Sequence, residues 1–189
     1  MKSENIEILK NGGVGIIPTD TVYGIVCSAF NKEALDRLFK IKGRDENKPP
    51  VVLISSLFDL EKFGAVITKK HSEIMAKYWP GKLTIIFDIA KEFEYLDKGR
   101  GLAIRFPDDE NILKFLRQTG PLATSSANIQ GQSPARNIIE AQKYFSLPSQ
   151  GDKVDFYEDG GELESAPSTL VKIVGDKVEI IRQGAVKIA

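Results

Sequence analysis

The strongest constraint on the fold lies near the C-terminus, where two short apolar runs, residues 170–174 and 177–181, are separated only by Gly175 and Asp176. A two-residue connection of the Gly-X kind between two such runs is typical of a β-hairpin. A hairpin requires two antiparallel neighbours in a sheet. Upstream of it, short apolar runs alternate with amphipathic segments, which is typical of interleaved strands and helices. We therefore expect a mixed β-sheet rather than a purely parallel one.

Periodicity and capping residues predict the individual elements. Leu35, Leu38 and Phe39 recur at helical spacing after Asn31, a plausible N-cap, and Gly43 suits the left-handed conformation that ends a helix. Residues 91–101 are polar and predict a loop. The same reasoning predicts helices over residues 6–10, 31–40, 57–63, 68–78, 111–119 and 137–145, and strands over 14–17, 25–27, 51–54, 83–87, 102–107 and from 122 onward.

Composition excludes several classes of protein and site. The single cysteine, Cys27, cannot form an internal disulfide, and with His71 as the one histidine a Cys/His zinc site is excluded. A Ser-His-Asp triad is disfavoured because no G-x-S-x-G segment accompanies His71. The 26 basic and 26 acidic residues cancel, so no overall charge favours nucleic acid or a membrane.

Length and hydropathy indicate the organisation of the chain. The 189 residues contain no repeat, low-complexity tract or linker, so we expect one domain spanning residues 1–189. No apolar run approaches the ~20 residues that cross a membrane, and no signal-peptide core follows the N-terminus. We therefore expect a cytoplasmic protein without a membrane partner.

Three polar segments beside predicted strands and helices are candidate ligand-binding loops: residues 19–24, 42–48 and 122–128. The first connects two strands and is rich in hydroxyl groups. The second follows a helix and holds three cations, and the third ends in small hydroxyl and amide residues. Each also has a plain structural interpretation. The first can be a turn that satisfies its own backbone, the second a set of cations at a helix C-terminus, and the third a simple connection.

Cations and short polar groups in these segments indicate binding of phosphates or carboxylates. Lys42, Arg44, Arg105 and Arg182 supply positive charge, and arginine binds such anions through a two-pronged fork. Tyr23 and the apolar strand ends offer a wall for a flat base. The sequence has no P-loop, no G-x-G-x-x-G segment and no histidine general base.

Seven short segments, in order, resemble the signatures of the YrdC-like threonylcarbamoyl-AMP synthases, and the resemblance runs from about residue 14 to 186. Residues 18–24, Pro-Thr-Asp-Thr-Val-Tyr-Gly, resemble the P-T-[DE]-T-V-Y-G opening of that family. Residues 42–44 and 126–128 match its K-x-R and S-x-N pairs. Further agreement comes from residues 78–84 (Tyr-Trp-Pro-Gly-Lys-Leu-Thr), 104–107 (Ile-Arg-Phe-Pro), 168–171 (Ser-Thr-Leu-Val) and 181–184 (Ile-Arg-Gln-Gly).

The resemblance implies a fold and a reaction. The fold is an α+β unit of three layers, α/β/α, with a twisted mixed sheet around a concave basic cavity. The reaction converts L-threonine, bicarbonate or CO2, and ATP to threonylcarbamoyl-AMP and pyrophosphate. Mg²⁺ is expected as a cofactor that arrives with ATP, with no protein ligand motif. The product serves the threonylcarbamoyladenosine modification of tRNA next to the anticodon, which partner proteins of a transferase complex complete.

The resemblance also assigns roles to residues. The expected catalytic pair is Lys42 and Arg44. ATP-binding is expected of Lys42, Arg44, Lys48, Thr84, Ser126, Asn128 and Arg182. Threonine-binding is expected of Thr19, Tyr23, Arg105 and Ser168, with Arg105 taking the carboxylate. The polarity of residues 42–48 suggests a lid.

Departures from the family pattern leave alternatives open. Asp45 and Pro50 replace a frequent proline and leucine, Lys82 replaces a frequent proline, and Asp108-Asp109 adds negative charge near the expected carboxylate site. One alternative is a paralogue that does not make threonylcarbamoyl-AMP. The other is a module that binds double-stranded RNA or tRNA without catalysis, although zero net charge favours no more than a weak RNA contact.

Overall fold

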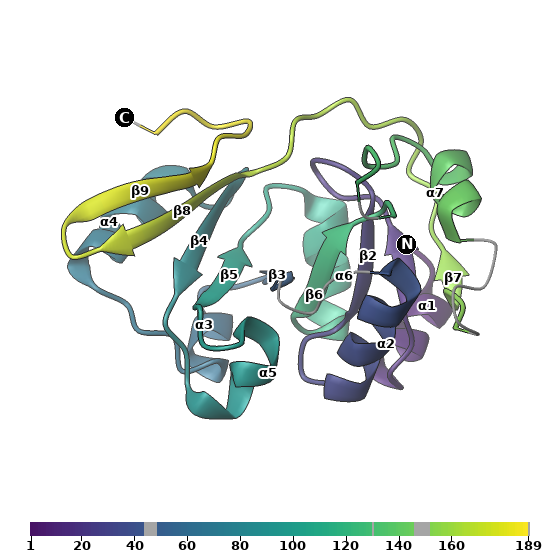
Figure 1. Ribbon diagram of the computed structural model, residues 1–189, viewed down its shortest axis with the longest axis horizontal. Coiled ribbons are helices and arrows are strands. Elements are labelled where there is room, and N and C mark those ends of the chain that lie inside the picture. The colour runs from purple at the N-terminus through teal and green to yellow at the C-terminus, as the bar shows by residue number, and fades with distance from the viewer. Residues whose placement is uncertain (44–48, 130, 146–151, 189) are drawn as a thin grey trace.

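The computed structural model describes residues 1–43, 49–129, 131–145 and 152–188. Within these residues nine strands form one sheet, in the order β7-β1-β2-β6-β3-β5-β4-β8-β9 (Figure 1). Parallel pairs are β1–β7, β3–β5 and β4–β8, and the other neighbours are antiparallel. The prediction of a mixed sheet is confirmed, and β8 and β9 form the predicted hairpin. The strands are β1 (Gly15–Ile17), β2 (Gly24–Ser28), β3 (Val51–Leu53), β4 (Leu83–Phe87), β5 (Leu102–Arg105), β6 (Leu122–Ser126), β7 (Phe156–Tyr157), β8 (Thr169–Val174) and β9 (Lys177–Arg182).

The helices begin and end close to where their capping residues predict. The side chain of Asn31 accepts a hydrogen bond from the Ala34 backbone N–H at the start of α2, and Gly43 ends that helix at φ 57°. Thr68 caps α4 in a reciprocal arrangement with His71. The helices are α1 (Ser3–Lys10), α2 (Lys32–Lys42), α3 (Phe58–Lys62), α4 (Lys69–Tyr78), η1 (Lys91–Phe93), α5 (Glu94–Asp97), α6 (Glu110–Thr119) and α7 (Ile138–Phe145).

Helices cover both faces of the sheet, which makes the three layers expected from the sequence. On β2, Ile25 and Cys27 belong to one buried hydrophobic cluster and Val26 to a second, because successive side chains of a strand point to opposite faces. The second cluster includes α1 and α6, which lie behind the sheet in Figure 1, whereas α2 lies in front of it. In the described chain, no helix has the length and apolar character that crossing a bilayer would require.

The prediction of a loop over residues 91–101 is wrong, because this stretch contains the short helices η1 and α5. Although the stretch is mostly polar, the side chain of Leu96 is buried in the core. The Asp97 carboxylate accepts hydrogen bonds from the backbone N–H groups of Gly99 and Gly101 and so closes the turn after α5. The stretch is ordered by local capping rather than by a continuous apolar face.

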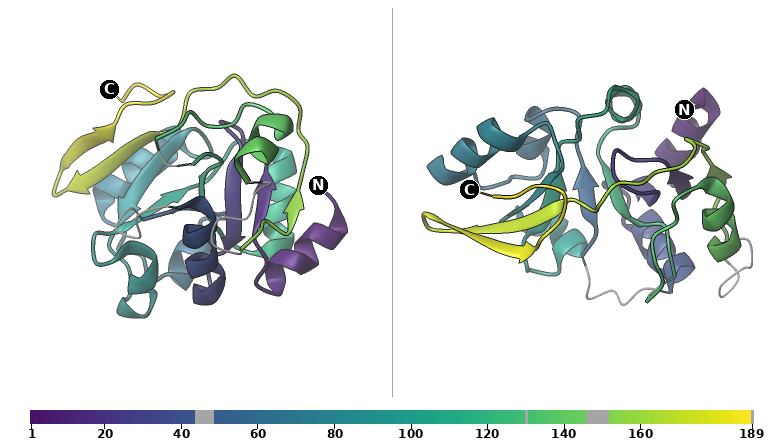
Figure 2. Two further views of the ribbon diagram at one scale, coloured as in Figure 1. Left: turned by 45° about the vertical axis from the view of Figure 1, so that its right-hand side comes forward. Right: turned by 90° about the horizontal axis from the view of Figure 1, so that it is seen from above.

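A long connection between β7 and β8 runs from one edge of the sheet toward the other. β7 lies at one edge of the sheet, whereas β8 lies beside β4 near the other edge. The chain therefore crosses the molecule over residues 158–168, and Figures 1 and 2 show this extended crossing segment. It brings Ser168 toward residues that come from the first third of the chain.

Candidate functional site

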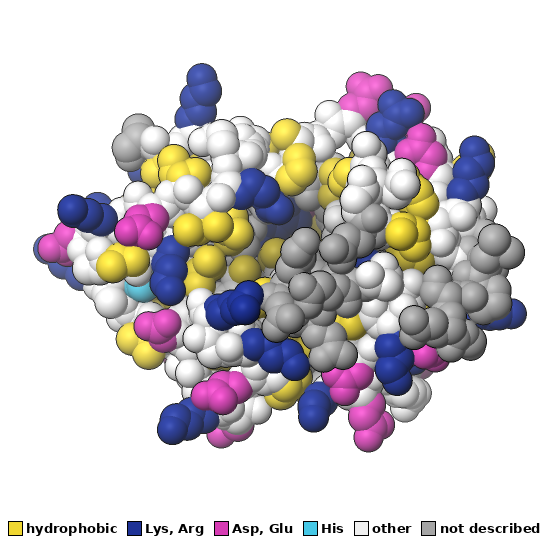
Figure 3. Space-filling view, viewed as in Figure 1, with side chains coloured by type: hydrophobic (Ala, Val, Ile, Leu, Met, Phe, Trp, Pro, Cys, Tyr) yellow, Lys and Arg dark blue, Asp and Glu magenta, His cyan; other side chains and the backbone are white. Residues whose placement is uncertain are grey.

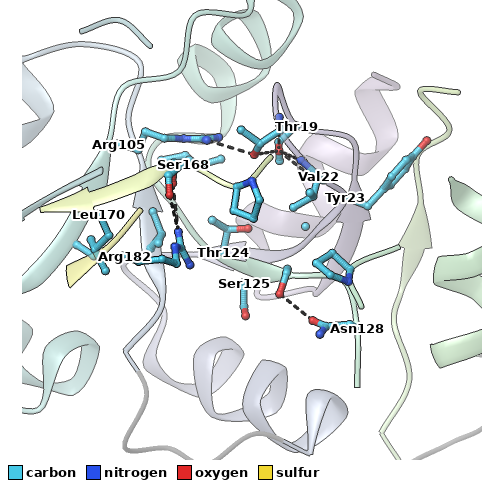
Figure 4. A pocket seen from close by; sticks show the side chains of 18 of the residues that line it. Thr19, Val22, Tyr23, Arg105, Thr124, Ser125, Asn128, Ser168, Leu170 and Arg182 are labelled. Atoms are coloured by element: carbon cyan, nitrogen blue, oxygen red, sulfur yellow. Dashed lines mark hydrogen bonds between the residues drawn. The ribbon is translucent and has the colours of Figure 1, made fainter. Parts of the chain in front are cut away.

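A cavity of about 420 Å³ lies where the β1–β2 loop, the ends of α2 and β6, β5 and the crossing segment meet (Figure 4). In Figure 3, hydrophobic and cationic side chains lie together in the middle of the visible face, and acidic side chains lie mostly toward its edge. The described residues that line the cavity include no Asp or Glu. The lining includes eight residues predicted from the sequence: Thr19, Tyr23, Lys42, Arg105, Ser126, Asn128, Ser168 and Arg182.

Lys42 and the Ser126–Asn128 pair form one side of this cavity. The Lys42 ammonium group donates hydrogen bonds to the Asn128 side-chain oxygen at 2.7 Å and to the Ser126 carbonyl oxygen. The Ser126 hydroxyl donates to the same Asn128 oxygen at 2.7 Å. The side chain of Asn128 is fixed in turn, because its amide group donates to the Gln132 carbonyl oxygen. Lys42, the first residue of the K-x-R segment, is thus adjacent in space to the S-x-N segment, 84 residues further along the chain.

Two further predicted residues, Arg44 and Lys48, lie outside the described residues. Most of the predicted lid, residues 42–48, lies there as well. Within the described chain, only Lys42 and Gly43 of that segment are placed, and Gly43 ends α2. The roles expected for Arg44 and Lys48 therefore stay predictions.

Arg105, at the end of β5, forms a buried ion pair beside the cavity. One terminal nitrogen of its guanidinium lies 2.5 Å from an oxygen of Asp20, and the other donates to the Thr21 hydroxyl at 3.2 Å. The side chains of Arg105 and Asp20 are 4% and 6% exposed. Within the described structure, the Arg105 Nε and the second Asp20 oxygen are buried without a hydrogen-bond partner.

Burial and charge act in opposite directions on this pair. Burial raises the pKa of the Asp20 carboxyl above its ordinary value, whereas the positive charge of Arg105 lowers it. Burial also lowers the pKa of Arg105, and the charge of nearby Arg182 acts in the same direction. Arginine nevertheless stays protonated at neutral pH. The sequence predicted Arg105 as a carboxylate ligand but did not predict Asp20 as its partner.

The β1–β2 loop matches both of its sequence interpretations. The Thr19 hydroxyl donates to the Val22 carbonyl oxygen at 2.6 Å and accepts from the backbone N–H groups of Thr21 and Val22. The loop is therefore a turn that satisfies its own backbone. Thr19 and Tyr23 also line the cavity, so the same turn forms part of its wall.

Tyr23 is one of the residues that line the cavity, but its hydroxyl group is bonded elsewhere. Its hydroxyl donates to the Gly161 carbonyl oxygen at 2.8 Å and accepts from the Gly160 backbone N–H at 2.8 Å. In Figure 4 the hydroxyl points away from Thr124 and Ser125 in the cavity. Burial raises the pKa of this phenol. Tyr23 therefore joins the β1–β2 loop to the crossing segment.

Thr84 does not line the cavity but lies behind one of its walls. Thr84 is fully buried on β4, and its hydroxyl lies 2.7 Å from that of Ser168. Ser168 also binds Arg182, which donates to the Ser168 carbonyl oxygen at 2.9 Å. Burial lowers the pKa of Arg182. The structure thus places Thr84 as a support for Ser168, and direct contact with a nucleotide, as expected from the sequence, would require it to be exposed.

Apolar residues complete the wall, and sequence reasoning did not single them out. Val22, Ala103, Pro167 and Leu170 line the cavity between the polar groups. Each lies within two residues of a predicted polar site residue. The alternation of side chains along a strand was the available signal for Ala103, which shares a face of β5 with Arg105.

Comparison with known proteins identifies the family. The family model named Sua5/YciO/YrdC, described as "Telomere recombination", matches residues 7–184. The chain belongs to the Sua5/YciO/YrdC family. A protein of Methanocaldococcus jannaschii, provisionally named a threonylcarbamoyl-AMP synthase, is 36% identical over 97% of this chain and 87% of its own. The threonylcarbamoyl-AMP synthase of Methylobacillus flagellatus is 30% identical, covering 88% of this chain and 91% of its own.

Solved structures of the Sua5/YciO/YrdC family share the fold. The crystal structure of Pyrococcus abyssi Sua5 complexed with L-threonine has a TM-score of 0.86 and 26% sequence identity, over 96% of this chain and 53% of that one. The mixed sheet with its covering helices, as expected from the family resemblance, is therefore confirmed.

Proposed function

We propose that this chain is a threonylcarbamoyl-AMP synthase, an ATP-dependent nucleotidyltransferase that joins L-threonine, bicarbonate or CO2, and ATP. One observation carries the proposal. A single cavity holds Lys42 with Ser126 and Asn128 on one side, and Arg105 with Ser168 and Arg182 on another. Cations on two sides of one cavity can bind a nucleotide phosphate and a small carboxylate next to each other, as the reaction between them requires. The names and the L-threonine complex of the relatives support the same activity.

The nucleotide is assigned to the side that Lys42 forms, and Arg182 is proposed to reach its phosphates from the side of Ser168. Lys42 is held by two oxygen acceptors from the S-x-N segment, so its ammonium group has a fixed position from which to bind a phosphate. Ser126 and Asn128 supply further polar groups there. Arg44 and Lys48 are proposed to complete this site as their positions in the family pattern imply.

The amino acid is assigned to the side that Arg105 forms. The guanidinium is the proposed ligand of the threonine carboxylate, with the hydroxyl of Ser168 nearby at the wall that Thr84 supports. Thr19 lines the same region. Tyr23 is proposed to contribute ring surface only, because its hydroxyl is bound to the crossing segment.

The proposed reaction depends mainly on how the protein positions the reactants. The threonine amine attacks the carbon of CO2 and loses a proton, which gives a carbamate. A carbamate oxygen then attacks the α-phosphate in line, and pyrophosphate leaves. Nucleotidyl transfer depends chiefly on alignment and on stabilisation of phosphate charge, so the scarcity of histidine is no obstacle. Lys42 and Arg182 are the residues proposed to stabilise that charge.

Mg²⁺ is proposed to enter with ATP. In the part of the chain that the structure describes, no cluster of three His, Cys, Asp or Glu side chains is suited to hold a metal ion. Mg²⁺ is commonly bound by substrate phosphates and water with few protein ligands, so this cavity fits an ion that arrives as a nucleotide complex. When bound, the ion would neutralise charge on the phosphates.

The threonylcarbamoyl-AMP product is proposed to pass to partner proteins that modify tRNA. The adenylate is an activated acyl donor, so its use requires a separate transferase that binds tRNA and this product. The described cavity, at about 420 Å³, suits small molecules rather than a folded RNA.

The test is release of pyrophosphate from ATP by the purified full-length protein. We expect release only when threonine and bicarbonate are both present. Omitting each in turn is the control. Folded protein that binds RNA but shows no such turnover would replace the synthase proposal with that of an RNA-binding module. Turnover with another amino acid in place of threonine would retain the reaction class and change the substrate.

A further inference from the structure

If the proposed function is correct, and this inference rests on it, the cavity must distinguish two kinds of anion. ATP brings a triphosphate, whereas the amino acid brings one carboxylate beside an ammonium group. Arg105 and Arg182 both line the cavity and lie close enough that the charge of Arg182 affects Arg105. A phosphate that occupied the Arg105 site would exclude the amino acid.

The two arginines differ in their neighbours. Arg182 donates to the neutral oxygens of Ser168, at 2.9 Å and 3.4 Å. Arg105 instead lies 2.5 Å from the Asp20 carboxylate. The Asp20–Arg105 pair as a whole carries almost no net charge, and the remaining N–H groups of the arginine are still directional donors.

The Asp20–Arg105 pair is part of the interior rather than a flexible surface bridge. Both side chains are nearly fully buried, and Thr21 fixes the second terminal nitrogen of the guanidinium. The second Asp20 oxygen has no hydrogen-bond partner within the described structure. The negative charge of Asp20 lies directly beside the guanidinium and therefore acts on any anion that approaches Arg105.

We propose that Asp20 is a specificity-determining residue that makes Arg105 a site for an amino-acid carboxylate and disfavours phosphate there. Inorganic phosphate carries up to two negative charges, so Asp20 repels it about twice as strongly as a carboxylate at the same distance. A zwitterionic amino acid carries no net charge and is repelled least. Discrimination by a repulsive group complements the attraction that Arg105 provides.

The test compares the wild-type protein with Asp20→Asn and with Asp176→Asn. Asp176 is an exposed carboxylate in the β8–β9 turn and does not line the cavity, so its substitution is a control for the same change in total charge. Threonine and inorganic phosphate are titrated by calorimetry into each protein, and inhibition of pyrophosphate release by phosphate is measured against threonine and against ATP. Circular dichroism establishes that each variant is folded.

In the wild type we expect phosphate to compete with ATP and not with threonine. In Asp20→Asn we expect phosphate to bind at least about fivefold more tightly and to become competitive with threonine, because an uncompensated arginine attracts the more highly charged anion. The Asp176→Asn protein should resemble the wild type in both respects. Unchanged phosphate affinity in folded Asp20→Asn would overturn the proposal.

Two further outcomes separate this inference from the proposed function. Phosphate that competes with threonine in the wild type would overturn the inference even if Asp20→Asn failed to fold. A wild type that binds threonine without releasing pyrophosphate would contradict the synthase function, and the calorimetric comparison would still decide the role of Asp20. A wild type that does not bind threonine would overturn both.

Discussion

At the scale of single residues, several residues that line the cavity also make hydrogen bonds that stabilise the fold. Thr19 lines the cavity while its hydroxyl binds its own turn. Tyr23 also lines the cavity, and its hydroxyl binds the crossing segment. Lys42 differs, because its bonds to Ser126 and Asn128 hold the charged group itself at the wall. A substitution at Lys42 should therefore affect turnover more than stability.

We expect Lys42→Met to lower turnover by at least about a hundredfold, the usual loss on removing one group that stabilises transition-state charge. The methionine keeps the length of the side chain but removes the donor to the Ser126 and Asn128 oxygens, so the melting temperature should fall by only about 2–4 °C. The measurements are pyrophosphate release and thermal unfolding. Lys40→Met, on the exposed side of the same helix, is the matched control and should leave both unchanged. Near-normal turnover in Lys42→Met would contradict the assigned role.

Tyr23→Phe should lower stability with little effect on substrate binding. Loss of the hydroxyl removes its hydrogen bonds with Gly160 and Gly161 and should cost about 1 kcal/mol, or roughly 2–4 °C in melting temperature for a chain of this size. The Michaelis constants for ATP and threonine should change by less than about twofold, because the ring remains in the wall. Tyr144→Phe, which removes one hydrogen bond to Ser133, is a control away from the crossing segment. A large rise in the threonine Michaelis constant would mean that the Tyr23 hydroxyl contacts the substrate.

Sequence motifs predicted which residues surround the cavity better than how their polar atoms point. Residue identity in the 18–24 and 126–128 segments was sufficient to predict that Thr19, Tyr23 and Asn128 lie at one site. The direction of the Tyr23 hydroxyl depends on where residues 160 and 161 pass, which no local pattern encodes. The contact of Thr84 with Ser168 was not predicted for the same reason, since it depends on the pairing of β4 with β8. The role of Thr84 in ATP binding stays a prediction.

At the scale of elements, the start of α4 depends on an uncharged histidine. The His71 side chain accepts a hydrogen bond from the Thr68 backbone N–H and stacks on Phe87. Burial lowers the pKa of His71, so the unfolded chain takes up its proton at a higher pH than the folded chain. Stability from this group is complete above the unfolded pKa of about 6.5 and falls as the pH drops below it.

We therefore expect the free energy of unfolding to fall between pH 7 and pH 5 more in the wild type than in His71→Gln. Glutamine keeps the acceptor that a capping box needs at this position and does not titrate. Urea unfolding of both proteins at several pH values is the measurement. Equal pH dependence in the two proteins would show that His71 makes no contribution over this range.

Elements with a clear periodic face or a standard cap were predictable, and elements stabilised by a few local bonds were not. Asn31 and Gly43 bounded α2 and Thr68 began α4 as expected. The residues of η1 and α5 offer no such face, and their order depends on Asp97 and the glycines that follow it. The strand order was equally inaccessible, because the parallel pairing of β1 with β7 joins residues about 140 positions apart.

At the scale of the whole molecule, the cavity joins segments from both ends of the chain, and bound ligands should therefore stabilise the fold as a unit. The β1–β2 loop and Lys42 lie in its first quarter, whereas Ser168 and Arg182 come from its last. A ligand present at 100 times its dissociation constant adds about 2.7 kcal/mol to the free energy of unfolding. For a chain of this length that corresponds to roughly 5–10 °C in melting temperature.

We expect ATP with Mg²⁺ and threonine each to raise the melting temperature, and Lys42→Met to abolish most of the ATP shift while keeping the threonine shift. The reason is that Lys42 lies on the proposed nucleotide side, whereas Arg105 lies on the amino-acid side. Thermal unfolding at saturating ligand measures both shifts, and Lys40→Met should retain both. If Lys42→Met lost the two shifts together, the cavity would not contain separable sites. If it lost neither, the nucleotide would bind elsewhere on the protein.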